Sequence, residues 1–216
     1  AHLLEQAKSL DKLSLEKLDS KIELFTDISA VYINDEFYLS SGEEIFTKHL
    51  DLYKETIRPY LNEASALVEL GAGYGSKLLN LSRSEDFLNL PLYAAEYTKN
   101  GCEIISLLAS SLNKEVRVGH CDFRELKIDD LGIPDNSIIF TSYSVHYVPQ
   151  LSPKFIDFIS NLNPLVVIHF EPCYENHLSN SIHGMLCEKY IEINDYNRNL
   201  ISVIRKSASI DNISMK

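Results

Sequence analysis

A glycine-rich turn is the part of the sequence best suited to cradle a small ligand. It reads Glu69-Leu70-Gly71-Ala72-Gly73-Tyr74-Gly75, after a short apolar run and before an apolar-periodic segment. Glycine lets the backbone turn sharply and approach a ligand without an intervening Cβ. The start of the helix predicted to follow offers unpaired N–H groups. Because many α/β proteins carry glycine between a strand and a helix, the turn alone is a weak signal.

Two acidic residues follow the turn, each at the end of a predicted strand. Glu96 comes 21 positions after Gly75, and Asp122 directly precedes Phe123. A carboxylate at the first of these positions can accept both hydroxyls of a ribose. An acid followed by phenylalanine can bond an exocyclic amine and cover one face of an aromatic ring. Either acid alone could be a helix cap or a solvated strand end, but their placement at successive strand ends makes that alternative the weaker one.

Alternating apolar and helical patterns place these residues on a doubly wound α/β sheet. The strand candidates are ALVEL, LYAAEY, VRVGHCDF, SIIFTSYS and PLVVIHFEP. Helical patterns follow the first two of them, and PKFIDFISNLN separates the last two. Strands that alternate with helices predict a mostly parallel, Rossmann-like sheet with crossover connections. We therefore expect one α/β core over residues 63–216.

The segments on either side of these strands predict helices. Residues 1–62 read as a helical lid whose apolar side could be formed by Leu10, Leu13, Leu18, Ile22 and Phe25. An aromatic and acidic stretch, VYINDEFYLSSGEEIF, interrupts the lid, and Ser40 or Ser41 can cap its last helix. After the last strand candidate we expect a loop and a long helix near 186–208. A sixth strand could begin at the final DNISMK, so we expect the last hairpin of the sheet to lie beyond it.

Size and composition indicate a soluble protein of one domain with an appendage. The chain has 216 residues, of which 45% are hydrophobic and 24% charged. No apolar run approaches the ~20 residues that span a bilayer, and the first ten residues lack the apolar stretch of a signal peptide. We therefore expect a cytoplasmic protein with no membrane partner.

Charge and cysteine usage exclude further classes. The net charge of −11 disfavours nucleic acid and suits a cationic ligand. The seven histidines form no HExxH pair, and the four cysteines form no CxxC pair, so we expect reduced thiols and no metal. These cysteines are Cys102, Cys121, Cys173 and Cys187. The sequence does not set the oligomeric state.

With the glycine turn and both acids in place, the sequence resembles the class I S-adenosylmethionine-dependent methyltransferases. The resemblance covers roughly residues 67–172, about half of the chain. A nicotinamide-binding fingerprint usually reads Gly-x-Gly-x-x-Gly, whereas this turn reads Gly-Ala-Gly-Tyr-Gly with an acid two positions before it. The resemblance implies S-adenosyl-L-methionine as cofactor and S-adenosyl-L-homocysteine as product. Tyr74 departs from the family pattern, in which a small residue or threonine is common, and we expect it to pack outward.

The resemblance also implies a set of cofactor-binding residues. The glycine turn would wrap the methionine portion with Glu69 beneath it, and Glu96 would hold the ribose. Asp122 and Phe123 would meet the adenine, while residues 141–143 would flank the sulfonium. The implied cofactor residues are Glu69, Gly71, Ala72, Gly73, Gly75, Glu96, Tyr97, Asp122, Phe123 and Ser142.

Candidates for catalysis and substrate binding come from three segments around the expected methyl group. An enzyme of this class mainly aligns the nucleophile and excludes water, although an oxygen nucleophile of high pKa needs a firmer base than an amine. The catalytic candidates are Tyr143, His146 and Glu171, and the substrate-binding candidates are Tyr32, Tyr38, Tyr147, Tyr174, Tyr190 and Asp195. For each residue the alternative is structural: a hydrogen-bonded buried histidine, a strand-end acid or a half-buried tyrosine.

We favour transfer of methyl to an amine nitrogen of a small molecule or peptide natural product. The tyrosines and carboxylates of residues 190–197, with Glu171 and Glu175, would suit a cationic substrate. The chain is also similar to N-methyltransferases that modify the N-terminal arginine amine of azole peptides such as plantazolicin. One alternative is an O-methyltransferase acting on a sugar or phenolic hydroxyl, with His146 or Glu171 as base. A second alternative is a non-catalytic cofactor-binding module. A nucleic-acid methyltransferase is disfavoured, because residues 141–147 read TSYSVHY rather than Asn/Asp-Pro-Pro-Tyr.

Overall fold

The core of the protein is one six-stranded sheet, seen in a computed structural model that describes residues 14–22, 27–33, 36–177 and 180–208. The strands lie in the order β6-β5-β4-β3-β7-β8, and all pair in parallel except β6, which runs antiparallel to β5 at one edge. Each of the five predicted strands is present. The strands are β3 (Leu67–Leu70), β4 (Leu92–Glu96), β5 (Val116–Asp122), β6 (Lys127–Ile128), β7 (Ile138–Ser142) and β8 (Val166–Phe170).

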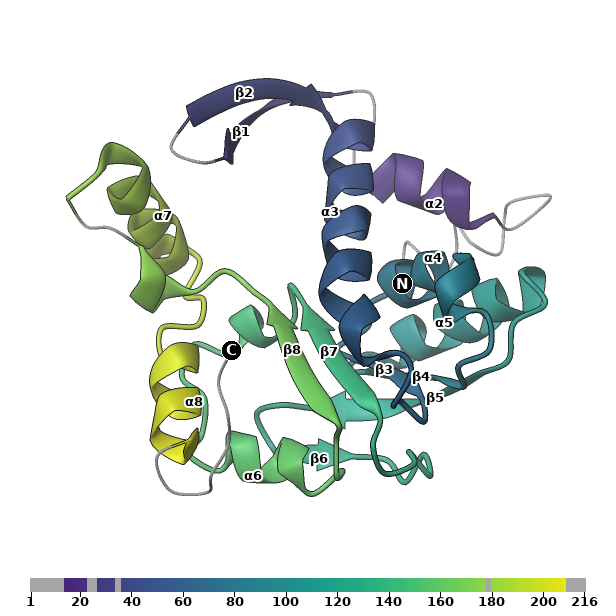
Figure 1. Cartoon of the computed structure of the whole chain (residues 1–216). Coiled ribbons are helices and arrows are strands. Elements are labelled where there is room, and N and C mark those ends of the chain that lie inside the picture. The colour runs from purple at the N-terminus through teal and green to yellow at the C-terminus, as the bar shows by residue number, and fades with distance from the viewer. Residues whose placement is uncertain (1–13, 23–26, 34–35, 178–179, 209–216) are drawn as a thin grey trace.

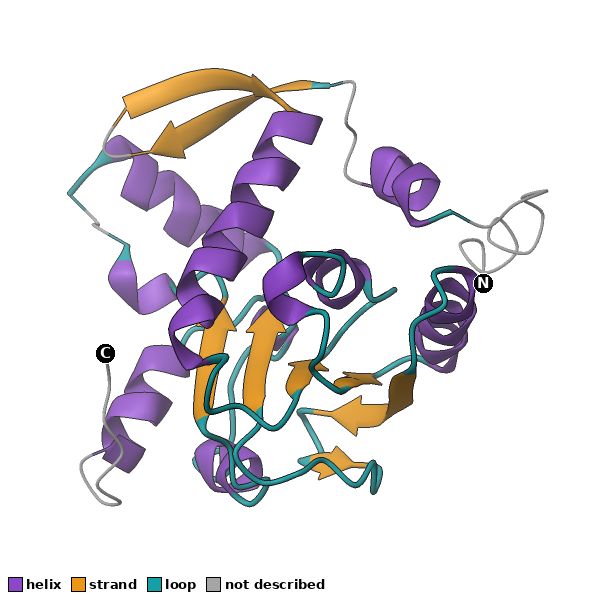
Figure 2. Ribbon diagram, turned by 45° about the vertical axis from the view of Figure 1, so that its right-hand side comes forward, coloured by secondary structure: helices purple, strands orange, loops and turns teal. Residues whose placement is uncertain are grey.

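Helices cover both faces of this sheet, which is the reason that β3, β4 and β7 are buried at every position rather than at alternate ones. Successive side chains of a strand point to opposite faces, so Ile138 and Phe140 join one core and Ile139 joins the other. Helices α3 (Gly42–Ile57), α4 (Ser76–Leu81) and α5 (Lys99–Ser111) lie on the first face, and α6 (Phe155–Ser160) and α8 (Leu200–Ala208) lie on the second. Figures 1 and 2 show these two layers. The prediction of a Rossmann-like, mostly parallel sheet is confirmed.

The N-terminal segment, predicted to be a helical lid, is only partly helical. Helix α2 (Leu15–Ile22) is followed by an antiparallel hairpin of β1 (Ile28–Ile33) and β2 (Glu36–Ser41), where the sequence reading expected no strands. β-branched and aromatic residues such as Val31 and Tyr32 favour extended backbone. The strands are short, and the helical spacing of apolar residues in the surrounding segment therefore dominates the sequence pattern. Ser41 caps α3 as expected, because its Oγ accepts the Glu44 amide at 3.2 Å. Three residues of the predicted apolar side, Leu10, Leu13 and Phe25, lie outside the described residues.

The predicted long helix near 186–208 is two helices. α7 (Ile182–Ile193) and α8 are separated at Asp195, whose φ of +52° is left-handed, a conformation that Asp adopts more readily than most residues. Asn197 then starts α8, because its Oδ1 accepts the amides of Asn199 and Leu200 at 3.1 and 2.8 Å. Side chains that cap the backbone thus outcompete the helical periodicity. The predicted sixth strand falls in residues 209–216, outside the described residues.

Short 3₁₀ turns complete the connections. They are η1 (Arg58–Tyr60), η2 (Glu85–Phe87), η3 (Val145–Tyr147) and η4 (Tyr174–Asn176). Two of them, η3 and η4, follow the carboxyl ends of β7 and β8, where the side chains nominated for catalysis lie. None of the helices in the described part of the chain has the length and apolar character needed to cross a bilayer.

Candidate functional site

The glycine turn between β3 and α4 is held against β4 and leaves open space over its middle. Gly71 and Gly73 have φ of +73° and +60°, and a Cβ on Gly71 would lie 2.4 Å from the Cβ of Ser144. The amides of Gly71 and Ala72 both donate to the Ala95 carbonyl, at 2.7 and 3.1 Å. A Cβ on Gly73 would meet nothing within 4 Å. The turn therefore has the shape of a cradle that a ligand can approach closely.

Gly75 serves packing rather than the cradle. Its φ is +82°, and a Cβ there would lie 3.1 Å from Ile105 of α5. A larger residue would therefore push α4 and α5 apart while its backbone was strained.

Glu96 ties the cradle to the end of β4. Its carboxylate accepts the amide of Gly73 at 3.0 Å, and the amide and hydroxyl of Thr98 at 2.9 Å each. The residue is 8% exposed. A carboxylate offers about four acceptor positions, so about one remains for a ligand hydroxyl.

Asp122 and Phe123 form a wall at the end of β5. Oδ1 of Asp122 accepts the amides of Arg124 and Glu125 at 2.8 and 3.2 Å, which orients the carboxylate. Among the described residues, no hydrogen-bond donor is seen on Oδ2. The Phe123 ring is buried and meets Phe155 edge-on, with centroids 5.8 Å apart. This wall therefore offers one acceptor oxygen beside an apolar ring.

These elements surround a cavity of about 310 Å³ at the carboxyl ends of β3, β4, β5 and β7. Strand order reverses there, because β4 and β7 flank β3 on opposite sides, and doubly wound sheets bind ligands at such a point. The volume lies in the range of small-molecule sites. The lining residues are Gly71, Gly73, Glu96, Tyr97, Thr98, Cys121, Asp122, Phe123, Arg124, Tyr143, Ser144, Tyr147 and Val148.

A larger hollow, of about 570 Å³, lies at the opposite edge of the sheet, beside the amino ends of β4 and β5. Its one lysine, Lys114, is engaged with the Ser82 carbonyl at 2.8 Å. None of the residues nominated from the sequence lines it.

Four predicted cofactor residues lie outside the cavity lining: Glu69, Ala72, Gly75 and Ser142. Glu69 is buried under α4, where its carboxylate accepts the Leu78 amide at 3.0 Å. Burial raises the pKa of Glu69 to about 8, against the lowering effects of that amide and of Lys77. Ser142 exchanges a 2.9 Å hydrogen bond with Tyr53 of α3. Both residues therefore support the cavity from behind it.

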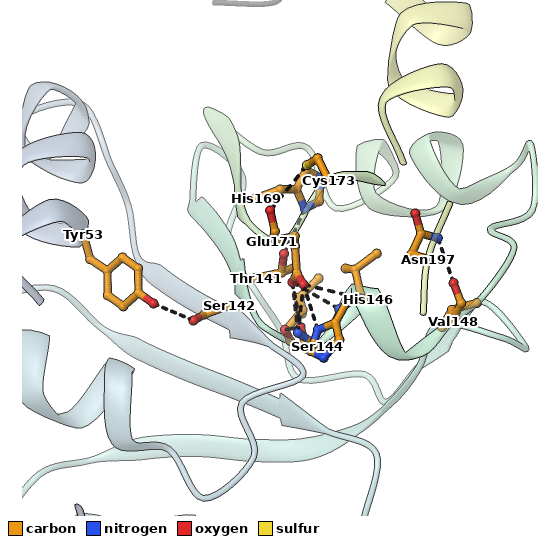
Figure 3. A network of polar contacts seen from close by, with 12 residues as sticks. Tyr53, Thr141, Ser142, Ser144, His146, Val148, His169, Glu171, Cys173 and Asn197 are labelled. Carbon is orange, nitrogen blue, oxygen red and sulfur yellow. Dashed lines mark hydrogen bonds and ion pairs between the residues drawn. The ribbon is translucent and has the colours of Figure 1, made fainter. Parts of the chain in front are cut away.

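Glu171 lies beneath the loop after β7 rather than in the cavity (Figure 3). Its side chain is fully buried and accepts the amides of Ser144, Val145 and His146 at 3.0 to 3.3 Å. Nδ1 of His146 lies 3.3 Å from the same carboxylate. Although burial alone would raise the pKa of Glu171, the hydrogen bonds from His146, Ser144 and Val145 hold it below its usual range. The geometry makes Glu171 the anchor of this loop.

His169 adds a second polar contact behind the loop. Its Nδ1 lies 2.9 Å from the Thr141 hydroxyl. Burial lowers the pKa of His169 to about 4, against the opposite effect of Glu171. At neutral pH this imidazole is therefore uncharged. The negative charge of Glu171 is thus stabilised by the hydrogen bonds that its carboxylate accepts, and not by a charged His169.

Tyrosine rings gather over His146 at the mouth of the cavity. The centroids of Tyr147 and Tyr196 lie 4.1 and 4.6 Å from that of His146, and Tyr190 lies 5.8 Å from Tyr196. Burial, and after it the hydroxyls of Tyr190 and Tyr147, raise the pKa of Tyr196. Tyr143 joins from the cavity side with a left-handed φ of +48°. The rings come from η3, α7 and the α7–α8 connection, so only the fold brings them together.

The remaining substrate candidates do not meet at the cavity. Tyr32 stacks on His183 of α7 at 3.6 Å, whereas Tyr38 lies on the other face of the hairpin and donates to Glu36. The Tyr174 hydroxyl donates to Glu192, and exposed Asp195 pairs with Arg198 at 2.8 Å. Glu175 accepts amides at the start of α8. No group of three or more metal-ligating side chains is found among the described residues.

The sequence reading missed Thr98, Cys121, Arg124, Ser144 and Val148 as lining residues. Thr98 carries a signal, because its Oγ accepts the Gly101 amide as the cap of α5. Cys121 lines the cavity from β5 as a neutral thiol, since burial raises its pKa to about 12. Ser144 directly follows residues 141–143, which the sequence predicts to flank the site. Arg124, whose guanidinium donates to the Tyr147 carbonyl at 3.2 Å, carries no such signal.

Helix α2 fixes the cradle from outside through Asp19. This buried carboxylate accepts the hydroxyls of Tyr74 and Ser76 at 2.8 and 2.6 Å and the amide group of Asn80 at 2.8 Å. Tyr74 is absent from the cavity lining and packs against the residues of α2. The departure from the family pattern thus has a partner in this chain.

We expect Asp19→Ala to lower the melting temperature by about 5–10 °C, because it removes a buried acceptor that three side-chain donors share, at a cost of about 2–4 kcal/mol. Glu16→Ala on the same helix removes only exposed contacts, the pair with Arg83 and the hydrogen bond from Ser14, and should melt near the wild type. Thermal unfolding followed by circular dichroism checks both. Equal melting temperatures for the two variants would contradict the role given to Asp19.

Comparison with known proteins identifies the fold. No model of a known protein family matches the chain, and no curated protein is similar to it. Among solved structures, the small RNA methyltransferase HEN1 has a TM-score of 0.57 and 19% identity, covering 79% of this chain and 22% of HEN1. This chain therefore spans about a fifth of that protein.

Two further structures are similar at lower scores. A SAM-dependent methyltransferase from Aquifex aeolicus has a TM-score of 0.40 and 23% identity, covering 69% of this chain and 65% of its own. Coclaurine N-methyltransferase, bound to N-methylheliamine and SAH, has a TM-score of 0.44 and 17% identity, covering 74% and 45%. The likeness to HEN1, together with the strand order of the sheet, shows that this chain has a Rossmann-like methyltransferase fold.

Proposed function

We propose that this chain binds S-adenosyl-L-methionine and transfers its methyl group to an amine nitrogen of a small molecule or a peptide natural product. One such acceptor is the N-terminal arginine amine of a modified peptide. The observation that carries the proposal is the cavity in which Gly71 and Gly73, both at positive φ, face the carboxylates of Glu96 and Asp122. When bound, the cofactor supplies a methyl group on a positively charged sulfur, already activated for attack.

The residues present fit this cofactor. The open space over Gly73 would take the methionine portion, and the remaining acceptor position of Glu96 would take one ribose hydroxyl. Oδ2 of Asp122 would accept the exocyclic amine of adenine, whose ring would lie against Phe123. The sequence predicts that Glu96 accepts hydrogen bonds from both ribose hydroxyls. Because three of its acceptor positions are already engaged, we propose that it accepts from one of them.

The tyrosines at the cavity mouth support an amine acceptor. Faces of Tyr147, Tyr190 and Tyr196 can attract a cation, and a net charge of −11 favours the approach of one. An amine attacks in its neutral form, so positioning and exclusion of water contribute more to its reaction than a strong base. The buried, fully engaged carboxylate of Glu171 suits a reaction of that kind.

The paired His146 and Glu171 favour a second candidate, methyl transfer to a hydroxyl. A carboxylate 3.3 Å from Nδ1 orients an imidazole as general bases often require. His146 is 5% exposed beneath the Tyr147 ring and does not line the cavity, which places this candidate second.

A His146→Ala variant that keeps its cofactor affinity but loses all turnover would favour hydroxyl transfer. A module without turnover would show cofactor binding and no methylated product from any acceptor.

The first test is calorimetric binding of S-adenosylhomocysteine. Wild type should bind at micromolar concentrations, and Glu96→Gln should bind at least about tenfold more weakly, because an amide nitrogen replaces an acceptor oxygen. Glu85→Gln, an exposed acid away from the cavity lining, is the matched control and should bind as the wild type does. If the folded wild type does not bind S-adenosylhomocysteine, the proposal is wrong. Amines and arginine-terminated peptides can then be screened for the mass gain of a methyl group.

A further inference from the structure

A row of rings continues from the cavity along α7 to the hairpin. It consists of Tyr147, Tyr196, Tyr190, His183, Tyr32 and Phe37, and is called here the aromatic row. The first two centroids are 5.5 Å apart, and Tyr190 follows at 5.8 Å. At the far end His183 stacks on Tyr32 and lies 6.1 Å from Phe37. Figure 1 shows α7 reaching up to the hairpin, with α3 on the other side.

Leu186 bridges the gap within the row. It lies three positions after His183 and four before Tyr190, and residues at those spacings are neighbours on one helix face. Its side chain is 62% exposed and that of Tyr190 is 60% exposed. At about 1.5 Å per residue, the helix carries the row about 10 Å away from Tyr190.

The hairpin extends the same apolar surface. Directly opposed residues of an antiparallel pair share a face, so Phe37 with Tyr32, and Leu39 with Ala30, point to the side of α7. Phe37 is 65% exposed and Leu39 is 78% exposed. A contiguous apolar surface of this kind usually marks a binding site.

We propose that the aromatic row, with Leu186 and Leu39, binds an extended apolar tail of the acceptor whose amine lies at Tyr147. This inference rests on the proposed function and names its substrate class: an amine with an apolar tail longer than about 10 Å. The acceptor is the occupant because the row is continuous with the cavity through Tyr147, which lines it. The row itself contains no lysine or arginine that would repel an amine.

The test is binding of primary n-alkylamines, from butylamine to decylamine, measured by calorimetry with S-adenosylhomocysteine present. Affinity should rise about two- to fourfold with each methylene, as expected for apolar burial. Leu186→Asp should flatten this dependence on chain length. Met185→Asp is the matched control, because Met185 is 50% exposed on a different side of the same helix and should leave the dependence unchanged.

The hairpin provides a second matched pair. Phe37→Ser should weaken the binding of decylamine more than that of butylamine. Tyr38→Ser, on the opposite face of the hairpin, should change the affinity for neither amine. Equal losses in Leu186→Asp and Met185→Asp, or an affinity that ignores chain length, would overturn the inference while leaving cofactor binding intact. Failure of the wild type to bind S-adenosylhomocysteine would instead overturn the proposed function and this inference with it.

Discussion

Glu171→Ala is expected to destabilise the protein by about 3–5 kcal/mol, because it leaves a set of buried donors without an acceptor. The amides of Ser144, Val145 and His146 and the His146 imidazole all meet this one carboxylate. No other acidic group is close enough to the loop to replace it among the contacts that the described residues make. For a chain of this length the loss corresponds to a fall of about 10–15 °C in melting temperature.

Thermal unfolding of Glu171→Ala and Glu171→Gln separates shape from charge. The glutamine variant keeps one acceptor oxygen but turns an amide group toward N–H donors, so it should lie between the wild type and the alanine variant. The stabilising contribution of Glu171 should also disappear in acid. Because its folded pKa is depressed, that contribution is present above the pKa of the unfolded chain and is lost as the pH falls through the lower, folded value. A wild-type melting temperature for the alanine variant would refute the anchoring role.

The carboxyl edge of the sheet is where the sequence predicts best. Apolar runs located β3, β4 and β5, and parallel strands end at one edge, so Gly73, Glu96 and Asp122 could be expected to meet. Local patterns suffice there because each residue ends its own strand. Their role toward a cofactor stays a prediction.

Non-local contacts explain what the sequence could not show. Glu171 reads as a strand-end acid open to substrate, but its partners lie 25 to 27 residues earlier and draw it beneath the loop. The register of the hairpin decides to which side of it Phe37 and Tyr38 point. A sequence interpreted as helical could not predict that register. Tyr196 reaches His146 only because Asp195 and Asn197 break the late helix.

Glu69→Gln is expected to stabilise the protein on the alkaline side by an amount on the order of 3 kcal/mol. Burial raises the pKa of Glu69 to about 8 from its ordinary value of 4.5. At a pH between these two values, the unfolded chain loses this proton while the folded chain retains it. The wild type should therefore lose stability as the pH rises from about 4.5 to about 8. Glutamine resembles the protonated acid, keeps an oxygen for the Leu78 amide and has no proton to lose in this window.

The measurement is the free energy of unfolding in urea at pH 5, 7 and 9 for the wild type and for Glu69→Gln. The difference between them should be small at pH 5 and largest at pH 9, and Glu115→Gln, an exposed acid, should follow the wild type throughout. Taking the difference removes His169, whose depressed pKa makes stability rise with pH between about 4 and 6.5 in both proteins. Parallel curves for the wild type and Glu69→Gln would mean that Glu69 is charged in the folded chain. A buried negative charge beneath the cradle would then have to be balanced, and Lys77, whose positive charge already acts to lower the pKa of Glu69, would serve that role.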